Sequence, residues 1–141
     1  MATADVGEVD RNGLRVLDRA ECLQLLARTT FGRIGVTFGA LPAVLPVSYR
    51  LVGDRILFRT GQGTKLEAAT RHSIVAFEVD DIDPLTHSGW SVMVTGEART
   101  VTDPDQLALL EDAAIPHWTR TDIETTVEIV TTLISGRWIG Q

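Results

Sequence analysis

The chain has 141 residues, a length typical of a single domain, and carries a formal net charge of −6 from 13 basic and 19 acidic side chains. This acidic balance argues against nucleic acid or an anionic membrane as a partner, because both bind basic surfaces. The sequence has no apolar run near the roughly 18 residues that span a bilayer. Its one cysteine, Cys22, excludes an internal disulfide and fits a reducing cytoplasm, so we expect a cytoplasmic protein.

The first part of the chain is expected to be a flexible lead-in over residues 1–16, with a short strand near 13–17. A helix follows this lead-in. Asp18 and Glu21 have the spacing of a capping box, and apolar residues then recur at helical intervals. The helix is predicted to end near Thr30.

From Gly32 the hydrophobic period changes to two, which predicts β-strands. The expected strands cover residues 32–38, 42–52, 55–60, 73–79, 89–101 and 125–139. Proline lacks the N–H that a central strand needs, so Pro46 is expected at a sheet edge or a bulge, and Gly96 is expected at a bulge.

Two short helices are predicted between these strands, over residues 64–71 and 103–112, and a loop is predicted over 114–122. Short hairpin turns join several of the strands, which makes the sheet antiparallel. Six strands with small helices across the gaps predict a mainly β fold, in which a closed or nearly closed barrel forms one domain over 17–141.

The segment most informative about function joins the third strand to the short helix and reads Phe58-Arg-Thr-Gly-Gln-Gly-Thr-Lys-Leu66. Its glycines permit close approach of a ligand to the backbone, and the start of a helix favours an anion. Over residues 55–72 four basic side chains accompany a single acid, so the local charge is +3 in an acidic protein. The segment therefore predicts a small phosphorylated ligand, the alternative being a plain structural turn.

Further motifs occur in a fixed order around this segment. They are Leu45-Pro-Val-Ser-Tyr49, the strand over 75–83, and Gly89-Trp-Ser-Val92. Together with the segment over 57–66, they resemble the pyridoxamine 5'-phosphate oxidase-like family of FMN-binding split-barrel proteins, most of all its short actinobacterial members. The resemblance extends over about residues 17–139.

The resemblance implies a six-stranded antiparallel split β-barrel with Greek-key-like connections, which forms a homodimer with two FMN sites in its interface. The implied cofactor-binding residues hold the phosphate, line the isoalloxazine ring with second-strand backbone, and approach the ring edge. In that order they are Arg59, Thr60, Thr64 and Lys65; Val47, Ser48 and Tyr49; and Trp90, Ser91 and Arg137. The resemblance implies that the last strand of the second subunit supplies either Arg137 or Trp138.

The implied activity is that of a flavin-dependent oxidoreductase acting on an unidentified small molecule. The flavin supplies the redox chemistry in such proteins, and no side chain stands out as a catalytic acid or base, so the catalytic residues are unassigned. Two alternatives keep the fold: a reductase that uses the 8-hydroxy-5-deazaflavin coenzyme, and a non-enzymatic flavin or haem carrier or redox sensor, with His87 as the candidate haem ligand.

No metal site is expected. The three histidines lack any spacing typical of metal ligands. The acidic stretch over 78–83 has the composition of a ligand cluster, but strand alternation sends its carboxylates to two faces. We interpret this stretch as the solvated end of a strand.

Overall fold

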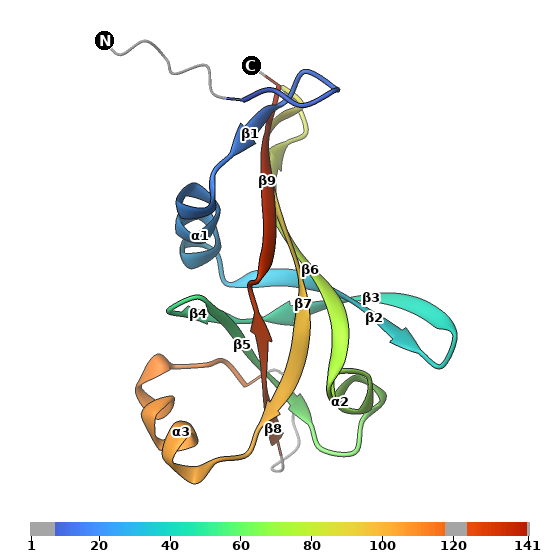
Figure 1. The fold of residues 1–141 in the computed structure, drawn as a ribbon, viewed down its shortest axis with the longest axis vertical. Helices are drawn as coiled ribbons and strands as arrows, with labels where there is room; N and C mark the ends of the chain where they lie inside the picture. The colour runs from blue at the N-terminus through green and yellow to red at the C-terminus, as the bar shows by residue number, and fades with distance from the viewer. Residues whose placement is uncertain (1–7, 118–123, 141) are drawn as a thin grey trace.

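The computed structural model describes residues 8–117 and 124–140, which form mainly one antiparallel sheet (Figure 1). Its strands are β1 Arg15–Leu17, β2 Phe31–Phe38, β3 Leu41–Ser48, β4 Arg50–Val52, β5 Arg55–Gly61, β6 Ser73–Asp83, β7 Ser88–Val101, β8 Glu124–Val130 and β9 Leu133–Ile139. Its helices are α1 Arg19–Arg28, α2 Lys65–Ala69, α3 Pro104–Leu109 and the 3-10 turn η1 Glu111–Ala113. Within the described ranges, no helix is long and apolar enough to cross a bilayer.

Six strands close into the barrel expected from the sequence. Their order in the sheet is β3-β2-β6-β7-β8-β5-β4. Only Tyr49 separates β3 from β4, so these two count as one bent strand, which forms both ends of the sheet. The barrel interior is apolar and includes the fully buried side chains of Ile34, Phe58 and Phe77. Pro46 lies in β3, which pairs with β2 alone, so its predicted edge position is confirmed.

The long strand β7 divides the sheet. Its first half pairs with β9, its second half pairs with β8, and β6 runs beside its whole length. The change of partner occurs at Gly96, where a Cβ would lie 2.0 Å from the carbonyl oxygen of Val130. The β6–β7 register contains no extra residue there, but on the other side of β7 the register shifts by one residue between the Thr95–Leu133 and Ala98–Ile129 pairs. The extra residue lies on the partner side, and the glycine permits a close backbone approach.

Three predicted strands differ in extent from the structure. The strand expected over 42–52 is interrupted at Tyr49, and the strand expected over 125–139 is two strands, β8 and β9. Contacts distant in sequence fix the second break, because the hydroxyl of Thr131 donates to the carbonyl oxygen of Asp54 at 2.6 Å. The strand β6 extends beyond 79 as far as Asp83, since its acidic end pairs with β7 in a long hairpin.

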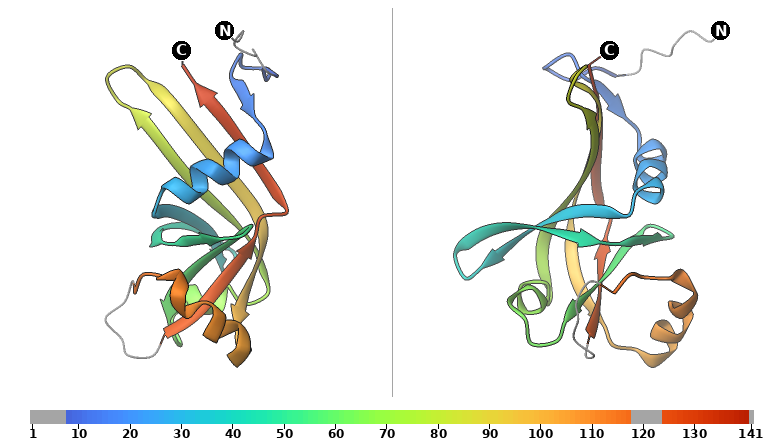
Figure 2. Two further views of the ribbon diagram at one scale, coloured as in Figure 1. Left: turned by 90° about the vertical axis from the view of Figure 1, so that its left-hand side faces the viewer. Right: turned by 180° about the vertical axis from the view of Figure 1, so that it is seen from behind.

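The helix α1 covers the inner face of the extended part of the sheet, as Figure 2 shows. The predicted capping box is confirmed, because the Asp18 carboxylate accepts from the Glu21 N–H and the Glu21 carboxylate accepts from the Asp18 N–H. Cys22 is buried on the packed face of the helix, and burial raises the pKa of its thiol. The thiol therefore belongs to the core.

The part of the lead-in that the structure describes packs against β9. The strand β1 pairs with β9, as predicted for a short strand near 13–17, and Val9 forms an isolated bridge with Arg15. Asp10 closes the intervening turn, because its carboxylate accepts from the N–H groups of Asn12 and Leu14. Residues 1–7 of the predicted lead-in, and 118–122 of the predicted loop, lie outside the described residues.

Candidate functional site

The junction between β5 and α2 brings two of the predicted phosphate-binding residues together. The hydroxyl oxygens of Thr60 and Thr64 are 3.2 Å apart. The Thr64 hydroxyl donates to the carbonyl oxygen of Gly61 at 2.8 Å and accepts from the N–H of Glu67. Since the Thr64 proton is already donated, Thr60 is the donor in their contact. Thr64 is thus the N-cap of α2, as predicted, and both hydroxyls face the same turn.

Lys65 follows directly as the first residue of α2. Its side chain is exposed and takes part in no ion pair with any residue that the structure describes. The partial positive charge at the start of the helix is partly neutralised by the buried carboxylate of Glu67. This carboxylate accepts from the Gly63 N–H and pairs with Arg71. These contacts, the Gly63 N–H first, lower the pKa of Glu67. The helix has only five residues, so Lys65, rather than the helix end, supplies the positive charge for an anion.

Arg59 lies apart from this group. Successive strand residues point to opposite faces, so Arg59 shares the face of Leu57, which packs towards α3 and η1, while Thr60 shares the face of Phe58 in the barrel interior. The Arg59 guanidinium donates to His117 Nε2 at 2.8 Å, and His117 Nδ1 lies 2.8 Å from a Glu124 carboxylate oxygen. In the described structure Arg59 is therefore not beside Lys65 and the two threonines.

The predicted ring-lining segment Val47, Ser48 and Tyr49 is buried. The Tyr49 hydroxyl donates to the Leu26 carbonyl oxygen at 2.6 Å, and burial raises the pKa of this phenol. The Tyr49 ring also meets Phe77 edge-to-face, so its side chain belongs to the core. What this segment offers a flat ligand is the unpaired backbone edge of β3, whose only sheet neighbour among the described strands is β2.

The second group of predicted residues lies where β7 pairs with β9 and consists of Trp90, Ser91 and Arg137. Ser91 is the cross-strand partner of Arg137, and Trp90 is the partner of Trp138. The Arg137 Nε–H donates to the Asp10 carboxylate at 2.9 Å, and Asp10 also has a lowered pKa, chiefly through the Leu14 N–H. Sequence reasoning did not identify Asp10 as a partner of Arg137, because the two residues are far apart in the chain.

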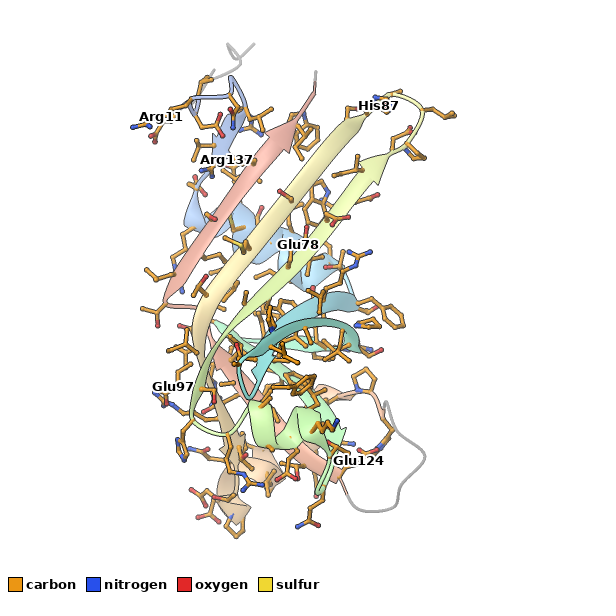
Figure 3. All side chains as sticks on the ribbon, turned by 90° about the vertical axis from the view of Figure 1, so that its right-hand side faces the viewer. Arg11, Glu78, His87, Glu97, Glu124 and Arg137 are labelled. Carbon is orange, nitrogen blue, oxygen red and sulfur yellow. The ribbon has the colours of Figure 1, made fainter. Side chains whose placement is uncertain are left out.

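The two groups lie at opposite ends of the molecule. Figure 3 shows Arg137 at one end of the sheet and Glu124 at the other, and Glu124 pairs with Gly61 at the β5–α2 junction. The structure therefore brings the hydroxyls of Thr60 and Thr64 together, with Lys65 next in the chain. It separately pairs Ser91 with Arg137, but does not join the two groups within one chain.

A charged cluster on the outer face of the sheet was not predicted as a unit. The Arg33 guanidinium lies 3.6 Å from Glu78 and 3.3 Å from Asp80. Burial, followed by the hydrogen bond and charge of Asp80, raises the pKa of Glu78 to about 7, while Arg33 opposes the shift. Alternation does place both acids on one face, but Arg33 enters only through the β2–β6 register, which the sequence does not reveal.

The histidines and acids form no metal centre in the described part of the chain, since no three of its His, Cys, Asp or Glu residues converge. His72 and His87 are both exposed and have left-handed backbone conformations. His87 lies in the turn between β6 and β7.

The fold and the junction define a small antiparallel split-barrel protein with a candidate anion site. The family model described as pyridoxamine 5'-phosphate oxidase matches residues 18–138. This chain therefore belongs to the pyridoxamine 5'-phosphate oxidase-like family.

Similar proteins occur in actinobacteria. The uncharacterized protein Rv0080 of Mycobacterium tuberculosis is 40% identical over 125 residues, which cover 85% of this chain and 82% of the relative. An FAD-binding protein from Mycobacterium smegmatis has a TM-score of 0.77 and 35% identity, with 89% of this chain and 98% of that chain covered. A conserved protein of unknown function from Corynebacterium diphtheriae has a TM-score of 0.76 and 27% identity, with coverage of 89% and 98%.

Proposed function

We propose that this protein binds a flavin nucleotide and acts as a flavin-dependent oxidoreductase on a small molecule. The observation that carries the proposal is the exposed Lys65, which has no ion-pair partner among the described residues and follows the adjacent hydroxyls of Thr60 and Thr64. A compact ammonium on the residue that follows the Thr64 cap suits the oxygens of a flavin phosphate. The FAD-binding relative from M. smegmatis adds FAD to the expected cofactor, FMN, and to its deazaflavin and haem alternatives.

Each part of the chain would have a distinct task. Lys65 would hold the phosphate by its charge, and the Thr60 hydroxyl would turn its proton from Thr64 to a phosphate oxygen. The backbone of Val47 to Tyr49 would align the ring along the edge of β3. The bound flavin would supply the electron and hydride chemistry. Since the phenol of Tyr49 is committed to the core, the segment would act through its backbone.

A second copy of the chain would complete the site. Ser91 and Arg137 are too far along the sheet to reach the phosphate group of their own chain, so they would serve the site of the other copy. The outer sheet face carries exposed apolar side chains suited to self-association: Val44, Ile74, Ile82, Met93 and Leu133. A two-fold interface must be self-complementary, and this face carries both Arg33 and the acids Glu78 and Asp80.

The assembly is tested by sedimentation velocity on the wild type and on Met93→Arg. We expect a dimer for the wild type and a monomer with weakened flavin binding for the variant, because a charged side chain in place of apolar Met93 must lose its water on association. A monomeric wild type that binds flavin fully would contradict the two-copy site.

Cofactor identity is tested by the visible absorption spectrum of the purified protein and by titration with FMN, FAD and the deazaflavin coenzyme. We expect a yellow protein that releases FMN or FAD on denaturation. A colourless protein that binds neither flavin contradicts the proposal, and preference for the deazaflavin would change the cofactor. Failure of the reduced, flavin-loaded protein to pass electrons to quinones or nitro compounds would favour the carrier function.

A further inference from the structure

A hollow lies beside the proposed phosphate site, between α2 and the turn that joins β2 to β3. It has a volume of about 450 Å³, within the size range of small-molecule sites. Its lining residues are Thr37, Phe38, Gly39, Lys65, Ala68 and Ala69. Lys65 lines this hollow and also directly follows the Thr64 cap, so the hollow adjoins the proposed phosphate site.

Small side chains line two sides of the hollow. Ala68 and Ala69 form its helical wall, and Gly39 turns the backbone with a φ of +62°, a conformation that favours glycine. A Cβ at Gly39 would have no neighbour within 4 Å. A larger residue at the exposed position of Ala68 would fill the space from the helix.

Phe38 gives the hollow an aromatic wall. One side of its ring packs against the barrel core, and the residue is only partly buried, so the ring also borders the hollow. An aromatic ring in this position can stack against a nucleobase, and stacking requires no specific hydrogen bonds.

The charge of the hollow suits a nucleotide. Lys65 is the one ionisable group in its lining. Two other hollows, of about 440 and 200 Å³, lie on the outer sheet face and contain Asp80, with Glu78 also in the larger one. Their carboxylates would repel a phosphate, and they lie on the face proposed for the second copy.

We propose that the hollow between α2 and the β2–β3 turn binds the adenosine monophosphate half of FAD, with adenine stacked on Phe38 and the second phosphate near Lys65. This inference rests on the proposed flavin site and specifies its cofactor. A mononucleotide would end at Lys65, whereas a dinucleotide would continue into the hollow. The site would therefore prefer FAD to FMN.

The test compares FAD and FMN dissociation constants, by fluorescence titration, for the wild type and two variants. Ala68→Trp fills the hollow from the helix, and Phe38→Leu removes the flat ring while keeping an apolar side chain. We expect each variant to weaken FAD binding at least fivefold and to leave FMN binding unchanged. Ala108→Trp, at an exposed position of α3, is the matched control and should alter neither constant.

The outcomes separate this inference from the proposed function. Equal wild-type affinity for FAD and FMN, or variants that change both constants equally or neither, would overturn the adenosine subsite while leaving flavin binding intact. A wild type that binds neither flavin would overturn the proposed function itself. Circular dichroism of each variant confirms that the barrel is folded.

Discussion

Arg59 and Thr60 are neighbours in β5, but their side chains lie on opposite faces of the sheet. Arg59 contacts His117, while the Thr60 hydroxyl lies 3.2 Å from that of Thr64. Thr60 is therefore part of the proposed phosphate site, and Arg59 stands outside it in the described structure.

This separation predicts unequal effects on cofactor binding. Thr60→Val should weaken flavin binding by about tenfold, the factor expected from one hydrogen bond to a charged group. Arg59→Gln should change the dissociation constant by less than about threefold, a shift of well under 1.4 kcal/mol. Fluorescence titration measures both, and a larger loss for Arg59→Gln would show that the arginine reaches the phosphate in the loaded protein.

Tyr49→Phe should lower stability and leave flavin affinity unchanged. The substitution removes the hydroxyl that donates to the Leu26 carbonyl oxygen, which costs about 0.5–1.5 kcal/mol, because Thr29 Oγ1 still donates to that oxygen. Urea unfolding measures the first effect and flavin titration the second. Loss of affinity in a stably folded Tyr49→Phe variant would mean that the phenol, and not only the backbone, serves the cofactor.

Gly136→Ala should destabilise the junction of β9 with α1. An added Cβ would lie 2.6 Å from the Cys22 sulfur and 3.1 Å from a Leu17 methyl carbon. Overpacking of this kind costs about 1–3 kcal/mol. In a double-mutant cycle followed by urea unfolding, Cys22→Ala should relieve part of the cost. Strictly additive effects would show that the sulfur is not the obstacle.

Glu78 should make stability pH-dependent near neutrality. Its pKa in the folded protein is about 7, above the ordinary 4.5, so the folded state holds the proton more tightly than the unfolded chain. The contribution of Glu78 is present below pH 4.5 and is lost as the pH rises through about 7. As the pH rises from 4.5 to about 7, the free energy of unfolding should therefore fall less for Glu78→Gln than for the wild type.

Urea unfolding at several pH values from acid to mildly alkaline provides the measurement. Glu97→Gln is the matched control, because Glu97 is an exposed β7 carboxylate paired with Arg99. Parallel pH profiles for the wild type and Glu78→Gln would contradict the raised pKa.

Local signals predicted much of the fold. The capping box at Asp18 and the period-two alternation each depend on residues close in sequence, and the structure contains both elements. The breaks at Tyr49 and Thr131 escaped prediction, because contacts with distant residues such as Leu26 and Asp54 hold them.

The candidate site was predictable only in part. The Thr64 cap and the position of Lys65 follow from the strand–helix junction. The same alternation that predicts β5 also places Arg59 and Thr60 on opposite faces, so the separation of these residues was available in the sequence. The pairing of Arg137 with Asp10 was not, since it depends on β1 and β9 lying side by side.

The most direct test of the account is the dissociation constant of FAD and of FMN for Lys65→Glu, measured beside Arg28→Glu at one salt concentration. Arg28 is an exposed basic residue at the end of α1, away from the β5–α2 junction. The account predicts that Lys65→Glu weakens binding of both flavins by more than about tenfold, whereas Arg28→Glu changes it by less than about twofold. Equal effects of the two charge reversals would contradict a phosphate site at Lys65.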